Sequence, residues 1–237
     1  MRSGNGGKRP PWHPVVVRTP TGSAILRGAA ALWIVAGVFY LMTEFVVAQQ
    51  VPGYSYSADY ISDLGRPLQS PMAAWMNGAF IAQGVAFAVA SALVVTALRT
   101  GRGAVVFLGL ALIYGAGCVV VGVFPSGGAA AHVHVAGATA AIVAGNLAVI
   151  TAGVGLLRRR RFRAMGSVSV ALGAAGLIGG GVLLCGSVFD TLVFGDGAWE
   201  RAAIYSIIGW QLLAAVAASV RRRQCPADWG LAPTARP

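Results

Sequence analysis

Polar residues that could carry out chemistry are concentrated in one segment between long apolar stretches, VPGYSYSADYISDLGRP at residues 51–67. Asp59 and Asp63 are four residues apart, and on a helix such residues share one face. Two neighbouring carboxylates could bind a cation or act as a general base on a substrate. Tyr56 and Tyr60 have the same spacing and share another face. The alternative is structural: the segment is a plug whose tyrosines belong to the aromatic belt at the membrane surface.

A second set of polar side chains is expected at the same depth. Glu44 lies about one turn before the end of an apolar stretch, where an acid is costly and is a functional candidate, unless its carboxylate reaches water. His132 and His134 are two residues apart, so on a helix they point in different directions, and they match no zinc motif. We expect these histidines to form hydrogen bonds rather than to bind a metal. The other candidates for a polar ligand-binding site are Asn77, Asn146, Arg201 and Tyr205.

The composition excludes an ordinary soluble enzyme. Hydrophobic residues make up 57% of the 237 residues, charged residues make up 11%, and the mean hydropathy is +0.71. Soluble domains contain about 25% charged residues. The three cysteines are scattered, so they indicate neither a disulfide framework nor a zinc site.

Six apolar stretches are long enough to cross a bilayer, which takes about 20 residues. They predict an all-α protein, a bundle of six transmembrane helices, with a short helix over residues 58–64 at the membrane surface. A disordered basic tail, residues 1–23, and a second tail, residues 221–237, flank this membrane domain. The predicted helices are residues 24–48, 72–98, 104–124, 133–157, 168–189 and 202–220.

The first stretch has an alternative interpretation as a signal peptide. Its last residues, Val-Val-Ala, are similar to a cleavage site. However, the stretch is longer than a signal-peptide core of about 7–15 residues, and Glu44 lies where the cleavage region is normally neutral. We therefore expect an uncleaved first helix.

The positions of the charges predict the orientation. Of the 18 Lys and Arg residues, only Arg66 and Arg201 lie outside the tails and the loops that share their side of the bundle. Basic residues collect in cytoplasmic loops, so we expect a multi-pass protein of the cell membrane with both termini in the cytoplasm. Topology alone explains the net charge of +11, and nucleic acid is not expected as a partner.

Glycine is abundant, with 33 residues, and six of them lie in or next to the fifth stretch. Gly176 and Gly180 form a small-xxx-small pair, which lets helix backbones approach closely. We expect packing inside the bundle. The alternatives are a broken helix that lines a cavity, and pairing with a second copy or another membrane protein.

Several short motifs together resemble a large family of prokaryotic membrane proteins, domain of unknown function 998. The resemblance covers residues 31–213 and implies about six spans, with no established activity and no catalytic residue to carry over. The segment AHVHVAG departs from the single-histidine pattern of the family, which makes a role for His134 doubtful. The motifs are SADYISDLGRP, Met76-Asn77-Gly78, Phe124-Pro125, the histidine region at His132, Gly145-Asn146 and ERAAIY at residues 200–205.

One contact can be predicted from the charge balance at the outer face. Six acids share that side with two bases, and an unpaired charge at the membrane boundary is costly. We expect Arg201 to pair with Asp63 or Asp59, and thereby to hold the first loop against the sixth helix.

These features favour an integral membrane protein without a cofactor that binds or moves a small or lipidic ligand through a polar site at the outer face, or an accessory subunit. The bilayer itself is the certain partner. The alternative is a membrane-embedded hydrolase in which Asp59 or Asp63 acts as a general base beside a histidine. That hydrolase would lack the third metal ligand expected for catalytic zinc, so an enzyme is the less favoured class.

Overall fold

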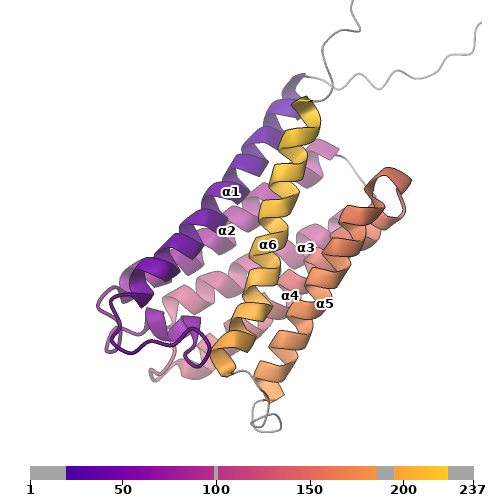
Figure 1. The fold of residues 1–237 in the computed structure, drawn as a ribbon. Helices are drawn as coiled ribbons and strands as arrows, with labels where there is room; N and C mark the ends of the chain where they lie inside the picture. Colours follow the sequence, from indigo (N-terminus) through magenta and orange to yellow (C-terminus); the bar gives the residue numbers. More distant parts are fainter. Residues whose placement is uncertain (1–19, 99–100, 186–194, 224–237) are drawn as a thin grey trace, which may run out of the picture.

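The structure is a computed structural model, and it describes residues 20–98, 101–185 and 195–223. The described chain is all-helical, with six long helices and two short 3-10 turns (Figure 1). The long helices are α1 (Pro20–Ala48), α2 (Ala73–Leu98), α3 (Arg102–Val123), α4 (Ala131–Leu157), α5 (Arg163–Cys185) and α6 (Asp196–Arg223), and the 3-10 turns are η1 (Ile61–Gly65) and η2 (Arg160–Phe162).

Each long helix is apolar enough to cross a membrane, which confirms the six predicted spans. The shortest, α3, has 22 residues and is about 33 Å long at 1.5 Å per residue. That length exceeds the hydrocarbon core of about 30 Å. Helices are expected because backbone N–H and C=O groups find no water in that core and must pair within their own segment.

One boundary differs from prediction in an informative way. α6 begins at Asp196 rather than at residue 202, because the loop before α2 supplies carbonyl acceptors for its first N–H groups. Arg201 therefore lies inside the helix rather than before it. Residues 20–23 and 221–223, which were predicted to belong to the tails, are parts of α1 and α6. The rest of both predicted tails and the predicted end of the fifth helix at residue 189 lie outside the described residues.

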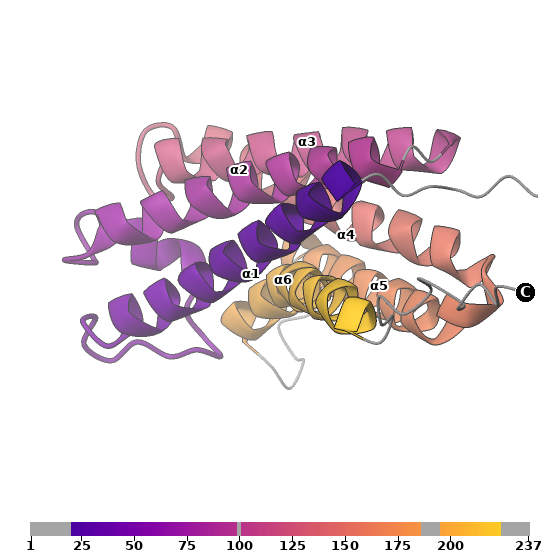
Figure 2. The same ribbon diagram turned by 90° about the horizontal axis from the view of Figure 1, so that it is seen from above.

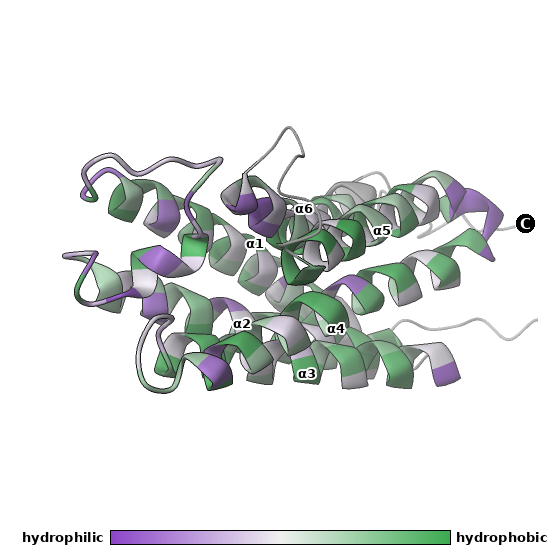
Figure 3. Cartoon of the chain, turned by 90° about the horizontal axis from the view of Figure 1, so that it is seen from below, coloured by the Kyte–Doolittle hydropathy of each residue, from purple (hydrophilic) through white to green (hydrophobic). Residues whose placement is uncertain are grey.

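The six helices form a ring in which each packs against the next along the chain (Figure 2). α1 lies between α2 and α6 and so closes the ring, while α4 also touches α6 across it. Hydrophilic residues gather at the two ends of the bundle, and the long middle is mostly hydrophobic (Figure 3).

The two ends of the bundle differ, and both described chain ends lie at the same one (Figure 1). We call this the basic end, because it also carries η2, in which Arg160 and Arg161 lie. The opposite end, the loop end, carries residues 49–72, the turn at residues 124–130 and the start of α6. Residues 49–72 are called the first loop.

The first loop is mostly irregular and contains η1. The predicted helix over residues 58–64 is replaced by a 3-10 helix, Ile61–Gly65, so Asp59 lies before it. Asp59 and Asp63 therefore do not share a helix face. The side chains of Ile61 and Leu64 are fully buried and pack with Met76 in the core at the loop end, so η1 sits on the bundle by its apolar face.

The glycines of α5 serve close packing. A Cβ added to Gly176 would collide with the side chains of Asn146 on α4 and Ser206 on α6. A Cβ on Gly153 of α4 would lie 2.9 Å from the carbonyl oxygen of Gly166 on α5, which is closer than ordinary contact. The small residues therefore let α5 approach both of its neighbours, as small-residue interfaces do in membranes.

Candidate ligand-binding site

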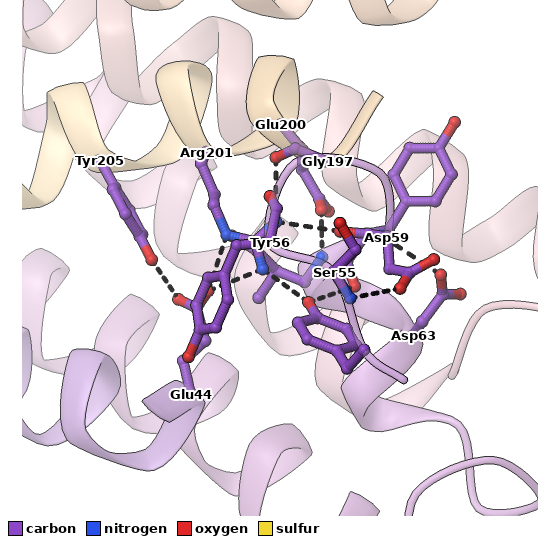
Figure 4. A network of polar contacts seen from close by, with 12 residues as sticks. Glu44, Ser55, Tyr56, Asp59, Asp63, Gly197, Glu200, Arg201 and Tyr205 are labelled. Atoms are coloured by element: carbon purple, nitrogen blue, oxygen red, sulfur yellow. Dashed lines mark hydrogen bonds and ion pairs between the residues drawn. The ribbon is translucent and has the colours of Figure 1, made fainter. Parts of the chain in front are cut away.

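A buried ion pair joins the last turn of α1 to the beginning of α6 (Figure 4). Nε and Nη2 of Arg201 are both 3.0 Å from Oε1 of Glu44, and the hydroxyl of Tyr205 donates to Oε2 at 2.8 Å. Glu44 is 1% exposed, so its carboxylate does not reach water and its charge is balanced inside the bundle.

The prediction that Arg201 pairs with Asp59 or Asp63 is therefore wrong, because its carboxylate partner is Glu44. Asp63 pairs with Arg66 at 3.2 Å, and the Asp59 carboxylate accepts the backbone N–H of Ser55 at 2.7 Å. Both loop acids are more exposed than Glu44 and find partners within the loop. The deeply buried acid gains most from a counter-charge, because an isolated charge is most costly there.

The predicted contact between the first loop and the sixth helix is nevertheless present, through backbone carbonyls. Nη1 of Arg201 donates to the carbonyl oxygens of Tyr56 at 2.6 Å, Asp59 at 2.9 Å and Gly197 at 3.0 Å. Nη2 donates to the hydroxyl of Tyr54 at 2.6 Å, and the guanidinium carbon lies 4.7 Å from the centre of the Tyr56 ring. Every guanidinium nitrogen therefore has an acceptor, and Arg201 is not free to bind an anion.

We call Glu44, Tyr54, Arg201 and Tyr205 the clasp. The sequence analysis missed Tyr54, although it lies two residues before Tyr56 in the same tyrosine-rich segment. Burial raises the pKa of the Tyr54 hydroxyl above its ordinary value, so the group stays neutral while it accepts from Arg201. The clasp ties the first loop to two helices that are far apart in the sequence.

Further hydrogen bonds fasten the first loop onto α6. The backbone N–H groups of Gly197 and Ala198 donate to the carbonyls of Ala58 and Ser57, at 3.3 and 3.0 Å. Helix N-termini leave such N–H groups without intrahelical partners, so the loop caps α6. The hydroxyl of Tyr60 donates to Asp196 at 2.6 Å. Tyr60 thus contacts the start of α6, whereas the Tyr56 ring stacks on Arg201.

η1 is fastened to the other side of the bundle. The side-chain amide of Asn77 on α2 donates to the Gly65 carbonyl at 2.9 Å, and the hydroxyl of Ser126 donates to the Ser62 carbonyl at 3.2 Å. The backbone N–H of Ile61 donates to a carboxylate oxygen of Glu200. Three segments of the chain, α2, the turn at residues 124–130 and α6, thus hold η1 in place.

A small cavity lies beneath η1, between α1, α2, α3, α4 and α6. Its volume is about 50 Å³. Most of the wall is apolar, and the polar or polarisable side chains among its lining residues are Tyr40, Ser62, Tyr114, Cys118, His134 and Glu200. The cavity therefore combines an apolar wall with a few hydrogen-bonding groups, the usual composition of a small-molecule site.

Each of two buried polar groups in the cavity lining lacks either an ion pair or a hydrogen-bond partner among the described residues. Glu200 is 7% exposed and forms no ion pair with any residue that the structure describes. Tyr40 is 2% exposed, and its hydroxyl has no hydrogen-bond partner among the residues that the structure describes. Buried polar groups are nearly always paired, so each exception requires an explanation.

The histidine that enters the interior is His134, whereas the side chain of His132 is exposed. α4 begins at Ala131, and two residues along a helix turn a side chain by about 200°. Nδ1 of His134 is 2.7 Å from the Phe124 carbonyl. A carbonyl only accepts, so Nδ1 carries the proton and Nε2 keeps its lone pair. The departure from the single-histidine pattern thus concerns a residue that lines the cavity.

Asn146 lies deeper and outside the cavity lining. Its amide donates to the carbonyls of Ile142 at 2.9 Å and Ala203 at 3.0 Å, and its oxygen accepts the Ser206 hydroxyl at 2.7 Å. These bonds link α4 to α6 and leave Asn146 no unpaired polar atom for a ligand.

A second polar pair, which the sequence analysis did not assign to the site, lies in the middle of the bundle. The amide of Gln83 donates to Gln211 at 2.6 Å and to the Tyr114 hydroxyl at 3.3 Å, and Gln211 donates to the Trp33 carbonyl at 2.6 Å. Tyr114 thus connects this pair to the cavity wall.

The structure can also be compared with the metal site and the histidine–aspartate pair considered in the sequence analysis. Within the described residues, no three side chains of His, Cys, Asp or Glu are placed to share a metal ion. Asp59 and Asp63 bind loop groups and Arg66, and His134 binds a carbonyl, so the histidine–aspartate pair of the hydrolase hypothesis is not formed there.

The fold and the site define a polytopic helical protein with a small, mostly apolar cavity at one end of a membrane-spanning bundle. The chain belongs to the family described as "Protein of unknown function (DUF998)", whose profile matches residues 34–217. The family resemblance of the sequence motifs is thereby confirmed. No curated protein and no solved structure matches the chain.

Proposed function

We propose that this protein binds a small ligand in the cavity beneath η1. The observation that supports this is a partly enclosed cavity whose lining includes two buried groups, the Glu200 carboxyl group without an ion pair and the Tyr40 hydroxyl without a hydrogen-bond partner among the described residues. A water-sized molecule needs about 10–15 Å³, so the cavity has room for roughly three to five. A ligand of a few heavy atoms would supply the missing partners.

The first loop is the cover of this site. Ser62 of η1 lines the cavity, and the loop is held by the clasp and by the caps on α6. Entry from the loop end therefore requires local opening of this cover, and the strength of the clasp sets how often it opens.

We further infer that the loop end faces the outside of the cell membrane. The basic end carries the arginines of η2 and both described chain ends, and basic residues favour the cytoplasmic side. The ligand would then reach the cavity from outside.

Cys118 offers a direct test, because it lines the cavity. Replacing Cys185 and Cys225 by Ser leaves it as the single thiol. Its modification by the small neutral reagent methyl methanethiosulfonate is then followed by mass spectrometry in the folded, detergent-solubilised protein. We expect slow but measurable modification.

A matched pair of variants tests the role of the cover. Tyr54→Phe removes a hydrogen bond to a charged group, worth about 1.5–3 kcal/mol, while the ring stays. Because 1.4 kcal/mol is a factor of ten, modification of Cys118 should accelerate roughly tenfold or more. Tyr56→Phe is the control, since the Tyr56 hydroxyl forms no hydrogen bond with the described residues. A Cys118 that reacts only after unfolding, in every variant, rejects the proposal.

A further inference from the structure

The buried charges around the cavity do not balance. Glu44 and Arg201 neutralise each other at 3.0 Å, and Glu200, the neighbour of Arg201 in the sequence, adds a second carboxyl group without a base of its own. Two acids thus stand against one base in the same buried region. The uncompensated group is Glu200, which lines the cavity, and a buried carboxylate requires a counter-charge or a proton.

The cavity wall is suited to a positive charge. The aromatic rings of Tyr40, Phe80 and Tyr114 contribute to it, and the rings of Tyr40 and Phe80 are 5.8 Å apart. Aromatic faces attract cations, most strongly where water is excluded. No lysine or arginine is among the described residues that line the cavity, so nothing in that wall repels a cation.

Three hydrogen-bonding groups of the wall can accept from an N–H donor. The carboxylate of Glu200 accepts one backbone N–H through Oε2, the Tyr40 hydroxyl has no partner among the described residues, and a neutral His134 ring that donates from Nδ1 to the Phe124 carbonyl has a lone pair on Nε2. A cation with several N–H groups would satisfy these acceptors together. The volume of about 50 Å³ limits such a cation to a few heavy atoms.

We infer that the cavity binds a small ammonium cation, ammonium or methylammonium, with Glu200 as its counter-charge. This inference rests on the proposed function, because it names the class of ligand for the same cavity. Glu200 and Tyr40 are the binding residues, and the aromatic rings complete the cage.

The experiment measures protection of Cys118. In the variant with Cys185 and Cys225 replaced by Ser, modification by methyl methanethiosulfonate is timed in ammonium or methylammonium chloride, and in sodium or potassium chloride at the same ionic strength and pH. For one site, the rate should fall by a factor of 1 + [L]/Kd, about tenfold at ten times Kd. The melting temperature should rise over the same concentration range.

Variants of the cavity residues separate the contribution of charge to ligand protection from the contribution of shape. Glu200→Gln keeps an oxygen to accept the Ile61 N–H but removes the charge, so both protection and the melting shift should disappear. Tyr40→Phe should weaken protection. Asp196→Asn is the matched control on α6: Asp196 binds Tyr60 and does not line the cavity, so protection should persist.

The possible results distinguish this inference from the proposed function. Equal protection by sodium or potassium overturns the ammonium assignment. Equal protection by neutral formamide, insensitive to Glu200→Gln, overturns the inference but leaves a small-molecule cavity. If no added molecule slows the modification of Cys118 or shifts the melting temperature, Glu200 is neutralised by a proton rather than by a cation. This result also overturns the inference. A Cys118 that never reacts in the folded protein overturns the proposed function itself.

Discussion

Replacing Arg201 by Gln should be among the most destabilising single changes at the loop end. The substitution leaves Glu44, which is 1% exposed, with the Tyr205 hydroxyl as its one remaining side-chain partner among the described residues. Breaking a buried ion pair by removing one member costs about 3–5 kcal/mol. The same substitution also releases the loop carbonyls of Tyr56 and Asp59, so the upper part of that range is expected.

Substitutions of the two members of the ion pair should lower the free energy of unfolding by different amounts. After Glu44→Gln, Arg201 keeps three carbonyl acceptors, the Tyr54 hydroxyl and the Tyr56 ring. We expect a cost of about 1–3 kcal/mol for this variant. Glu44→Leu should cost more than Glu44→Gln, because Nε of Arg201 and the Tyr205 hydroxyl then have no acceptor at position 44. The double variant Glu44→Gln/Arg201→Gln should lose less than the sum, with a coupling of about 1–3 kcal/mol.

The assay is the free energy of unfolding in mixed micelles, from denaturant titrations that include a matched control. Arg66→Gln makes the same chemical change in a surface pair with Asp63, whose side chains are 32% and 26% exposed. Surface pairs contribute about 0–1 kcal/mol. If Arg201→Gln costs no more than Arg66→Gln, or if the two clasp substitutions are additive within about 0.3–0.5 kcal/mol, the clasp is not a buried charge pair and the argument fails.

Three further predictions concern topology, the histidines and the glycines. In sealed cells, a thiol introduced at Ser126 should be labelled by an impermeant reagent and one at Arg160 should not; the reverse pattern would invert the proposed orientation. His134→Ala should cost about 1–3 kcal/mol, because the Phe124 carbonyl loses its partner, whereas His132→Ala should change the unfolding free energy by less than about 0.5 kcal/mol; similar effects in a melting assay would argue against the assigned hydrogen bond. Gly176→Ala should cost about 1–3 kcal/mol by overpacking, whereas Gly181→Ala, where an added Cβ meets open space, should be nearly neutral; equal melting temperatures would refute the close contact with α4 and α6.

Hydropathy was sufficient to predict the helices of this protein, because crossing a bilayer imposes a length and an apolar composition that leave few alternatives. A contact between the first loop and the sixth helix was predicted from charge balance, and Arg201 does contact the loop, but through backbone carbonyls rather than a loop carboxylate. The carboxylate that pairs with Arg201 could not be identified from the sequence. Choosing between Glu44 and Asp59 requires the relative depth and rotation of α1 and α6, and these are fixed only by packing between helices.

Two other features could not be predicted from the periodicity of the sequence. The spacing of Asp59 and Asp63 fits an α-helix, but Ile61–Gly65 forms a tighter 3-10 turn, so the shared face disappears. Both histidines lie on α4, which begins at Ala131, and the packing of α4 against its neighbours decides which of the two faces the interior. Such details determine which residues form a site, although they hardly affect the fold.

The clasp has a consequence for how the protein is made. Glu44 and Arg201 are separated by 157 positions in the chain, and α6 is the last of the described helices to leave the ribosome. Until then, α1 must enter the membrane with its carboxyl group lacking its native counter-charge. The first loop likewise cannot be fastened before α6 arrives. A chain truncated before α6 would therefore present an unpaired acid and an untethered loop to the quality-control proteases of the membrane, which would make completion of the last helix a checkpoint for survival of the whole protein.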